Sequence, residues 1–281
     1  MKKLNNLLMA GLALLIAFAC EQPAPKDIGI QLWSVREAMK EDPAGTIQKL
    51  GEMGYTFVEP AGYGDGKFYD MEPAEFKKLV EDNGMRVLSS HTGQALPDSA
   101  KWEETMAWWD QAIAAHEELG VTYLVQPFMG SAGYDSLEGL ANYVDYFNTI
   151  GEKAQAAGIQ FGYHNHANEF NELEGQIIYD YMLQNTDPEK VFFQLDLYWI
   201  KEGGKDAVDY FEKYPGRFKL WHVKDEAELG ASGEMDFAPI FAEKEQAGLE
   251  AIIVEVEKYN HEPIVSVEKS LEYLQNADFV Q

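Results

Sequence analysis

The chain has 281 residues, a formal net charge of −26 and a single cysteine, Cys20. So large an acidic excess argues against binding nucleic acid through its phosphates, because that requires clustered lysine and arginine. It also argues against docking on anionic lipid through protein charge. One cysteine excludes an intramolecular disulfide, so the fold depends on its hydrophobic core.

The N-terminus has the features of an export signal. Two lysines precede an apolar stretch over residues 7–18 and then Cys20, a secretory pattern too short for a stable transmembrane helix. Residues 17–20 (Ala-Phe-Ala-Cys) fit a bacterial lipobox, although its first position is usually leucine. We predict a signal peptide over 1–20, lipidation of Cys20 and a tether over 21–27; the alternative is a chance cysteine in a cleaved signal.

This prediction describes an exported, membrane-anchored lipoprotein in the periplasm or at the cell surface. The lipid anchor is then its only contact with the membrane. Removing the two N-terminal lysines changes the formal charge to 20 − 48 = −28. We interpret most of the excess carboxylates as a solvated acidic surface.

Beyond residue 27, short apolar runs alternate with longer amphipathic stretches, as in the repeated βα units of a parallel sheet. The predicted strands cover residues 28–33, 57–60, 86–91, 123–126, 159–164, 191–196, 219–223 and 251–255. The predicted helices cover residues 43–53, 72–83, 102–119, 137–157, 176–184, 206–213, 237–247 and 264–275.

Eight strands and eight helices in strict alternation predict a single α/β domain, a closed (β/α)8 TIM barrel over residues 28–281. A length of about 255 residues is typical of that fold. An open, doubly wound sheet is less consistent with the sequence, because no Gly-x-Gly-x-x-Gly motif follows the first strand.

Polar and ionisable residues gather at the predicted strand ends, where barrels of this class place their active sites. Four of the six histidines are among them. The residues concerned are Glu59, His91, Gln126, His164, His166, Asp196, His222 and Glu255. Because these strand ends meet at one face of the barrel, the pattern predicts a metal site there.

Three of these residues have simpler interpretations when each is taken alone. Asp196 is also a suitable helix N-cap, and His222 also suits a hydrogen-bonded position in the core. Glu255 follows an apolar run in which an unpaired carboxylate is costly to bury. Together, at neighbouring strand ends, the three favour a divalent metal.

Several blocks of sequence resemble the xylose isomerase-like TIM barrel family, and more narrowly its sugar phosphate isomerase/epimerase branch. The blocks are IGIQLWSVR (28–36), GYHNH (162–166) followed by EF (169–170), QLDLYW (194–199), and YPGRF (214–218) leading to HVKD (222–225). They occur in the expected order and cover nearly the whole mature chain. Gly230, Gly233 and the pair at 236–237 fit the glycine-rich loop after strand 7 in that branch.

The resemblance implies a divalent ion, often manganese, held by side chains from strands 5 to 8. Carried over position by position, Asp196, His222 and Glu255 supply three ligands. The strand 5 position is usually a glutamate, and here it falls on His164, with His166 two residues further on the same side of the strand. Iron, cobalt, zinc and magnesium are the alternatives to manganese.

In epimerases of this family, the strand 5 and strand 8 glutamates also exchange a proton with the sugar carbon. A histidine in one of these places still binds such metals and titrates near neutrality, so metal-assisted proton abstraction is retained. We therefore expect a sugar isomerase or epimerase in which Glu255, His164 or His166 moves the proton and Lys224 stabilises negative charge. For Lys224, a surface ion pair with Asp225 is the alternative.

Two other functions stay open at this point. The histidine on strand 5 makes dehydration of a keto-sugar, as in the related inosose dehydratases, a competitor to epimerisation. A non-catalytic surface lipoprotein that captures sugars is the rival from another class. Endonuclease-like cleavage of phosphodiesters on a related barrel is inconsistent with the charge near −28.

The expected substrate is an unphosphorylated sugar, for instance a keto-glycoside, because no phosphate-binding glycine loop or arginine cluster stands out. The predicted substrate-binding residues are Glu59, His91, Gln126, Glu169, Trp33 and Trp199. Aromatic residues near strand ends that suit stacking on a sugar ring, or ordinary packing, are Trp33, Tyr63, Phe128, Tyr198 and Trp199. Assembly as a homo-oligomer is left open.

Overall fold

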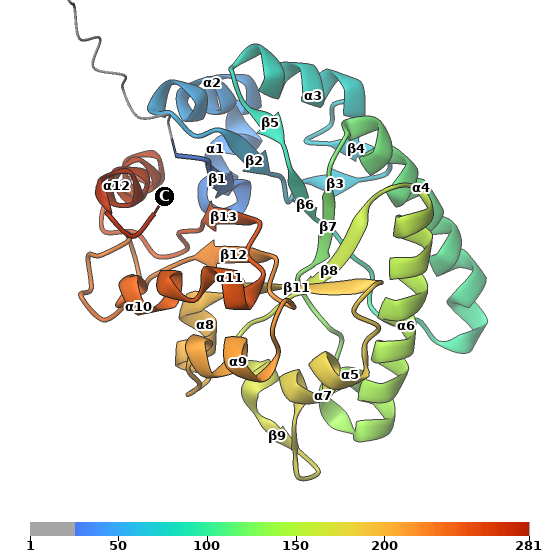
Figure 1. Cartoon of the computed structure of the whole chain (residues 1–281). Coiled ribbons are helices and arrows are strands. Elements are labelled where there is room, and N and C mark those ends of the chain that lie inside the picture. The colour runs from blue at the N-terminus through green and yellow to red at the C-terminus, as the bar shows by residue number, and fades with distance from the viewer. Residues whose placement is uncertain (1–25, 281) are drawn as a thin grey trace, which may run out of the picture.

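Buried parallel strands form the inner wall of the protein in the computed structural model, which describes residues 26–280 (Figure 1). The strands are β1 (Ile28–Gln31), β2 (Phe57–Glu59), β5 (Arg86–Val87), β6 (Ser89–His91), β7 (Tyr123–Gln126), β8 (Gln160–His164), β11 (Val191–Asp196), β12 (Leu220–Val223) and β13 (Ala251–Val254). Their hydrogen-bonded order is β5-β2-β1-β13-β12-β11-β8-β7-β6. The predicted third strand is divided at Leu88, and its halves β5 and β6 pair with β2 and β7. The sheet thus closes into the predicted (β/α)8 barrel.

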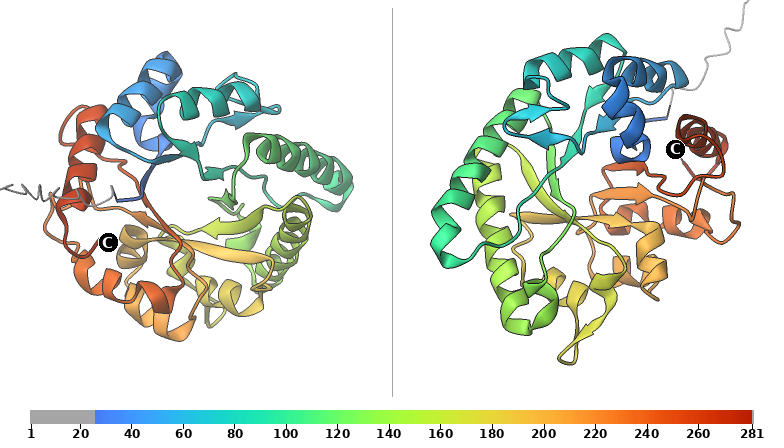
Figure 2. Two further views of the ribbon diagram at one scale, coloured as in Figure 1. Left: turned by 45° about the horizontal axis from the view of Figure 1, so that its top comes forward. Right: turned by 180° about the vertical axis from the view of Figure 1, so that it is seen from behind.

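The helices form an outer ring around this wall (Figures 1 and 2). They are α2 (Pro43–Met53), α3 (Pro73–Asp82), α4 (Trp102–Leu119), α6 (Leu137–Ala156), α7 (Ile178–Asn185), α9 (Ala207–Lys213), α10 (Phe237–Ala242) with α11 (Lys244–Ala247), and α12 (Pro263–Asn276). Each predicted helix is confirmed within a residue or two, and the one over 237–247 is interrupted at Glu243. Within residues 26–280, no helix combines the length and the apolar character needed to cross a bilayer.

Short elements that the sequence did not indicate fill the loops after the strands. They are η1 (Leu32–Val35), α1 (Arg36–Glu41), β3 (Tyr63–Gly64), β4 (Lys67–Phe68), η2 (Ser99–Lys101), α5 (Ala132–Asp135), η3 (Asn168–Phe170), β9 (Glu172–Leu173), β10 (Gln176–Ile177) and α8 (Leu197–Glu202). Trp33 therefore lies on a 3-10 turn and not on the predicted first strand. The helix predicted from residue 176 begins at Ile178, because residues 176–177 pair with β9.

The first residues that the structure describes are hydrogen-bonded to the end of the barrel where the strands begin. Lys26 Nζ donates to the carbonyl oxygens of Leu274 and Ala277, at 3.1 and 2.6 Å, beside the end of α12. Asp27 accepts from both terminal nitrogens of Arg86, at 3.0 and 2.7 Å. The predicted signal peptide, Cys20 and most of the predicted tether lie outside the described residues.

His116 is a buried histidine of α4 whose ionisation opposes folding. Its Nδ1 donates to the Ala112 carbonyl oxygen at 2.6 Å, and its Nε2 lies 2.9 Å from Ser90 Oγ. Burial lowers the pKa of His116 to about 4. The unfolded chain therefore binds a proton here first, so stability falls as the pH drops from about 6.5 towards 4, by about 3 kcal/mol in total.

Chemical denaturation across this pH range checks the expectation. A His116→Gln variant keeps a polar amide in the same place but cannot titrate. Its unfolding free energy should depend less on pH than that of the wild type by roughly this amount. Equal pH dependence of the two proteins would contradict the role assigned to His116.

Candidate metal and substrate site

Four side chains predicted as metal ligands meet at the carboxyl end of the barrel. His164 ends β8, Asp196 ends β11, His222 lies on β12, and Glu255 follows β13. One ligand atom from each lies within 4.8 Å of the others, and all four residues are buried. Asp196 and His222 are direct partners in the register of β11 and β12. The parallel strands thus gather two imidazoles and two carboxylates in one place.

Asp196 has one oxygen in use and one free. Its Oδ1 accepts from the backbone nitrogens of Tyr198 and Trp199, at 2.9 and 2.8 Å, and so caps α8. Its Oδ2 is buried without a hydrogen-bond partner among residues 26–280 and lies 4.0 Å from His164 Nε2. Burial raises the pKa of Asp196 above its ordinary range, against the effect of Lys224. A buried carboxylate oxygen left without a donor fits a bound cation.

His222 lies between two carboxylates. Its Nε2 is 2.7 Å from Glu59 Oε1, and its Nδ1 is 3.2 Å from Glu255 Oε2. Burial opposes the charged imidazole, but Glu255 and Glu59 raise the pKa of His222 to about 10. Burial also opposes ionisation of Glu255, yet Lys224 and His222 hold the pKa of Glu255 well below its ordinary range. His222 therefore interacts with a carboxylate through each of its ring nitrogens.

Lys224 is almost fully buried beside this cluster, with 2% of its surface exposed. Its Nζ lies 3.5 Å from Glu255 Oε2, 3.2 Å from Glu257 Oε1, and 5.6 Å from the centre of the Trp199 ring. Asp225 instead accepts from Ser232 Oγ at 2.6 Å in the following loop. The alternative of a surface pair between Lys224 and Asp225 is therefore wrong.

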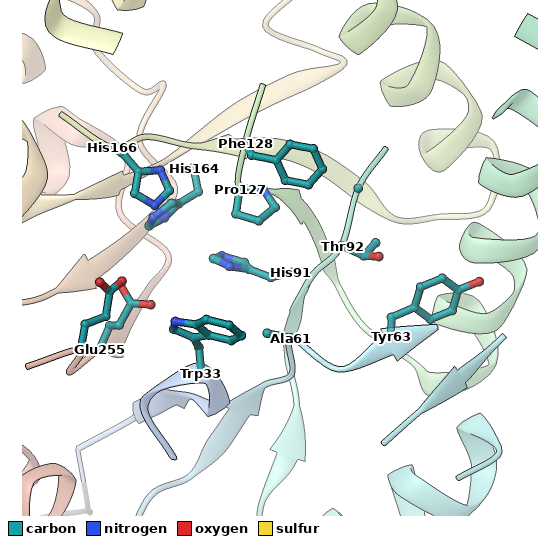
Figure 3. Close-up of a pocket in the computed structure, with 12 residues that line it drawn as sticks. Trp33, Ala61, Tyr63, His91, Thr92, Pro127, Phe128, His164, His166 and Glu255 are labelled. Atoms are coloured by element: carbon teal, nitrogen blue, oxygen red, sulfur yellow. The ribbon is translucent and has the colours of Figure 1, made fainter. Parts of the chain in front are cut away.

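A cavity of about 600 Å³ opens beside the four clustered side chains. Figure 3 shows His91, His164, His166 and Glu255 around the same space, with Trp33 on one side and Phe128 on the other. The lining residues are Trp33, Ala61, Tyr63, His91, Thr92, Gly93, Pro127, Phe128, His164, His166, Glu255 and Glu257. Trp33 and Phe128 are 46% and 40% exposed, so part of each ring is accessible to a ligand.

Of the predicted substrate-binding residues, Trp33 and His91 line this cavity. Glu59 and Gln126 do not, because both are fully buried. Gln126 Nε2 donates to the backbone oxygens of Gln94 and Phe128, at 3.0 and 2.8 Å. Contact of these two buried residues with a substrate stays a prediction.

Glu169 and Trp199 also lie outside the cavity lining. Glu169 is fully buried; it accepts from the hydroxyls of Tyr134 and Tyr163 at 2.7 and 2.6 Å and from His166 N at 2.9 Å. Trp199 packs beside His166, with ring centres 6.0 Å apart. Glu169 anchors the segment that carries His166, and the centre of the Trp199 ring lies 5.6 Å from Lys224 Nζ. Contact of either residue with a substrate stays a prediction.

Gln194 is a site residue that the strand-end pattern missed. It lies on β11 two residues before Asp196, and its Oε1 is 2.6 Å from His91 Nε2 and 3.0 Å from His164 Nδ1. Its Nε2 donates to Glu59 Oε2 at 2.8 Å. Burial would raise the pKa of Glu59, but His91 and His222 lower it to about 2. The alternation of strand side chains, which puts residue 194 on the side of residue 196, is the signal that points to it.

In enzymes with a (β/α)8 barrel the active site lies at the carboxyl ends of the strands, which is where this chain has its buried His/Asp/Glu cluster. Residues 47–277 match the family of xylose isomerase-like TIM barrels. The chain therefore belongs to that family.

The solved structure of a sugar phosphate isomerase/epimerase from Parabacteroides distasonis is 35% identical to this chain. The match covers 93% of this chain and 97% of that one, with a TM-score of 0.86. An inosose dehydratase from Geobacillus kaustophilus is 22% identical over 193 residues, which are 64% of this chain and 60% of that protein's length. A D-psicose 3-epimerase, 16% identical with a TM-score of 0.69 over 90% of this chain and 99% of that one, shares the fold. The first two are described as enzymes, which supports an enzyme here.

Proposed function

We propose that this protein is a metal-dependent sugar isomerase or epimerase that removes a proton next to a carbonyl group of an unphosphorylated sugar or keto-glycoside. The observation that carries the proposal is the buried Oδ2 of Asp196, which has no donor within residues 26–280. It belongs to a cluster of four ligand-type side chains. That cluster borders a cavity large enough for a sugar.

The proposed ligands are His164, Asp196, His222 and Glu255. Two imidazole nitrogens and two carboxylates form a donor set that suits manganese, and also iron, cobalt or zinc better than magnesium. When bound, such an ion supplies a Lewis acid that polarises a substrate carbonyl and acidifies the neighbouring C–H group. We take manganese as the first ion to test.

Glu255 is the proposed general base. Its Oε2 faces His222 and Lys224, which leaves Oε1 as the oxygen to take a proton from substrate in the cavity. The opposing charges favour its ionised form, which is the form that can accept a proton, and they also weaken it as a base. Lys224 does not line the cavity, so we assign it an electrostatic role through Glu255 rather than direct contact with the sugar.

The histidines of β8 and the following loop are the proposed second proton carriers. Burial, together with His222 and His91, holds the pKa of His164 well below its ordinary value, so this imidazole is neutral; it can accept a proton only while its Nε2 is not bound to the metal. His166 lines the cavity beside His164, with ring centres 5.1 Å apart. Return of the proton at a new carbon or face gives an isomer or epimer.

Dehydration is the second candidate, and two observations favour it. The family position that is usually glutamate is His164 here, so the symmetric pair of carboxylates expected of an epimerase is missing. Inosose dehydratases are also among the relatives. In this version Glu255 removes the proton and His166 donates one to the departing hydroxyl. Capture of sugars without catalysis is the third candidate.

The cavity lining favours an uncharged sugar. Among its twelve residues none is lysine or arginine, whereas Glu255 and Glu257 are both present. A phosphate group would face these carboxylates, and no lysine or arginine lines the cavity to pair with it. The exposed rings of Trp33 and Phe128 suit stacking on the apolar face of a sugar. We therefore propose an unphosphorylated substrate, although the Parabacteroides distasonis structure is described as a sugar phosphate isomerase/epimerase.

We also propose that the protein is an exported lipoprotein held at the membrane through Cys20. The support is the N-terminal sequence alone. Metabolic labelling with a palmitate analogue should mark the wild-type protein and leave a Cys20→Ser variant unmarked. Labelling of both proteins would overturn the assignment.

Proton exchange with heavy water tests the proposed chemistry. The manganese-loaded protein is incubated in D2O with methyl 3-keto-glucoside, fructose or an inosose, and the C–H signals beside the carbonyl are followed by proton NMR. Loss of a C–H signal together with a new sugar isomer supports the isomerase or epimerase, and an unsaturated or deoxy product supports the dehydratase. Binding of these sugars without any exchange favours the sugar-binding protein.

A further inference from the structure

A buried amide links the two histidines that border the cavity on β6 and β8. We infer that Gln194 is a positioning residue: Glu59 holds its amide in one orientation, and the amide oxygen fixes the proton positions on His91 and His164. The hydrogen bonds concerned are present in the structure. Their role in metal binding depends on the metal-dependent function proposed above.

The orientation of the Gln194 amide follows from what surrounds Glu59. Glu59 Oε1 accepts from Gln31 Nε2 at 2.7 Å, and its Oε2 accepts from Ser89 Oγ. Gln194 Nε2 donates to the same Oε2 at 2.8 Å. A carboxylate that already accepts these bonds repels a carbonyl oxygen, so the amino group of Gln194 faces Glu59. The amide oxygen must then face the histidines.

The amide oxygen determines which imidazole nitrogen carries hydrogen. Gln194 Oε1 lies 2.6 Å from His91 Nε2 and 3.0 Å from His164 Nδ1. A carbonyl oxygen only accepts, so both of these nitrogens must donate. A neutral imidazole carries one N–H group, so His91 is the Nε2–H tautomer and His164 is the Nδ1–H tautomer. The lone pair of His164 is then on Nε2.

This assignment places the free nitrogen of His164 where a ligand atom is needed. His164 Nε2 lies 4.0 Å from Asp196 Oδ2, the buried oxygen without a donor. In the other tautomer an N–H group would face a cation and exclude it. A carboxylate at position 164 would need no such control, because both of its oxygens can bind a metal. Gln194 therefore allows a histidine to act as a ligand at this position.

Nitrogen NMR of the metal-free protein tests the tautomers directly. Long-range proton–nitrogen spectra of protein labelled with 15N-histidine distinguish a protonated from an unprotonated ring nitrogen. At about pH 8, where these imidazoles are neutral, we expect the Nδ1–H form of His164. Its signals are those that disappear in a His164→Gln variant. Observation of the Nε2–H form in the wild type would overturn the inference.

Two substitutions at one position separate tautomer control from packing. Gln194→Met has similar length but no acceptor, so His164 should populate the Nε2–H form. Gln194→Glu, with a proton on the oxygen that faces Glu59, keeps an acceptor next to both histidines, so the Nδ1–H form should persist. Gln126→Met is the matched control, since Gln126 is equally buried but bonds only to backbone oxygens. A folded Gln194→Met protein whose His164 tautomer is unchanged would contradict the role of Gln194.

Metal affinity supplies a second readout. Competition with a chelating dye should show Mn²⁺ or Co²⁺ binding weakened by about tenfold to a hundredfold in Gln194→Met, and little changed in Gln126→Met. If the wild type binds neither ion, the proposed metal function fails, while the NMR spectrum still tests the tautomers. If Gln194→Met does not fold, comparison of Gln194→Glu with the wild type decides: loss of the Nδ1–H form in that variant overturns the inference.

Discussion

Replacing Asp196 and His222 together with alanine is expected to abolish stable binding of a divalent metal. The two residues are register partners at the ends of β11 and β12, and they contribute half of the four ligand-type side chains in the cluster. Their removal leaves too few ligands to hold an ion. Mass spectrometry of the purified proteins should find about one Mn, Fe, Co or Zn ion per wild-type chain and none in the double variant.

Single substitutions separate loss of the metal from loss of a helix cap. Asp196→Asn keeps an oxygen that can accept from the start of α8, because asparagine is also a good N-cap, but it removes the charge. Asp206→Ala removes the equivalent cap of α9, where Asp206 Oδ1 accepts from Val208 N at 2.8 Å. The first variant should lose the metal and the second should keep it. A wild-type protein that stays metal-free in excess Mn²⁺, but still binds sugar, would favour the sugar-binding protein.

The order of strands and helices was predictable because each element is long enough to show its own pattern. The fully buried β11 reads as an apolar run ending in Asp196, and α6 shows a regular apolar face over 20 residues. The hairpin of β3 and β4 has two residues in each strand, which is too few for a period to appear. Its existence depends on packing against α3 and α4, where Phe68 contacts Phe76 and Tyr63 contacts Trp108, and not on local sequence.

The ligand-type cluster was predictable because parallel strands bring their last residues to one edge. That rule does not indicate how deep a side chain lies. Glu59 ends β2 as Asp196 ends β11, yet Glu59 is enclosed by donors from Gln31, Ser89 and Gln194 and does not line the cavity. Those donors come from three other strands, so their convergence on Glu59 depends on the closed barrel.

The ion-pair partner of Lys224 was likewise not predictable from the sequence. Its position two residues beyond His222 placed it on the same side of the chain. Whether it pairs with a neighbour in sequence or with a distant carboxylate depends on how the loops after β12 and β13 meet. The structure brings Glu257 within 3.2 Å of its Nζ and turns Asp225 into the loop that contains Ser232.

Replacing Glu255 with glutamine is expected to reduce proton exchange between the sugar and solvent by about a hundredfold to ten-thousandfold. Glutamine has nearly the same shape and keeps an oxygen that can bind a metal, but its amide cannot accept the substrate proton. The rate is measured by proton NMR in D2O with excess Mn²⁺, and the metal content of each sample is determined in parallel. Loss of exchange with the metal still bound assigns the general base to Glu255.

Glu257→Gln is the matched control for this experiment. Glu257 lines the same cavity and also lies close to Lys224 Nζ, so the change in charge is the same. It is not part of the four-residue cluster. Its exchange rate should stay within about tenfold of the wild type, because altered charge near the site costs far less than loss of the base. Full exchange by a metal-loaded Glu255→Gln protein would assign the general base to His164 or His166 instead. An imidazole, and not a carboxylate, would then remove the substrate proton.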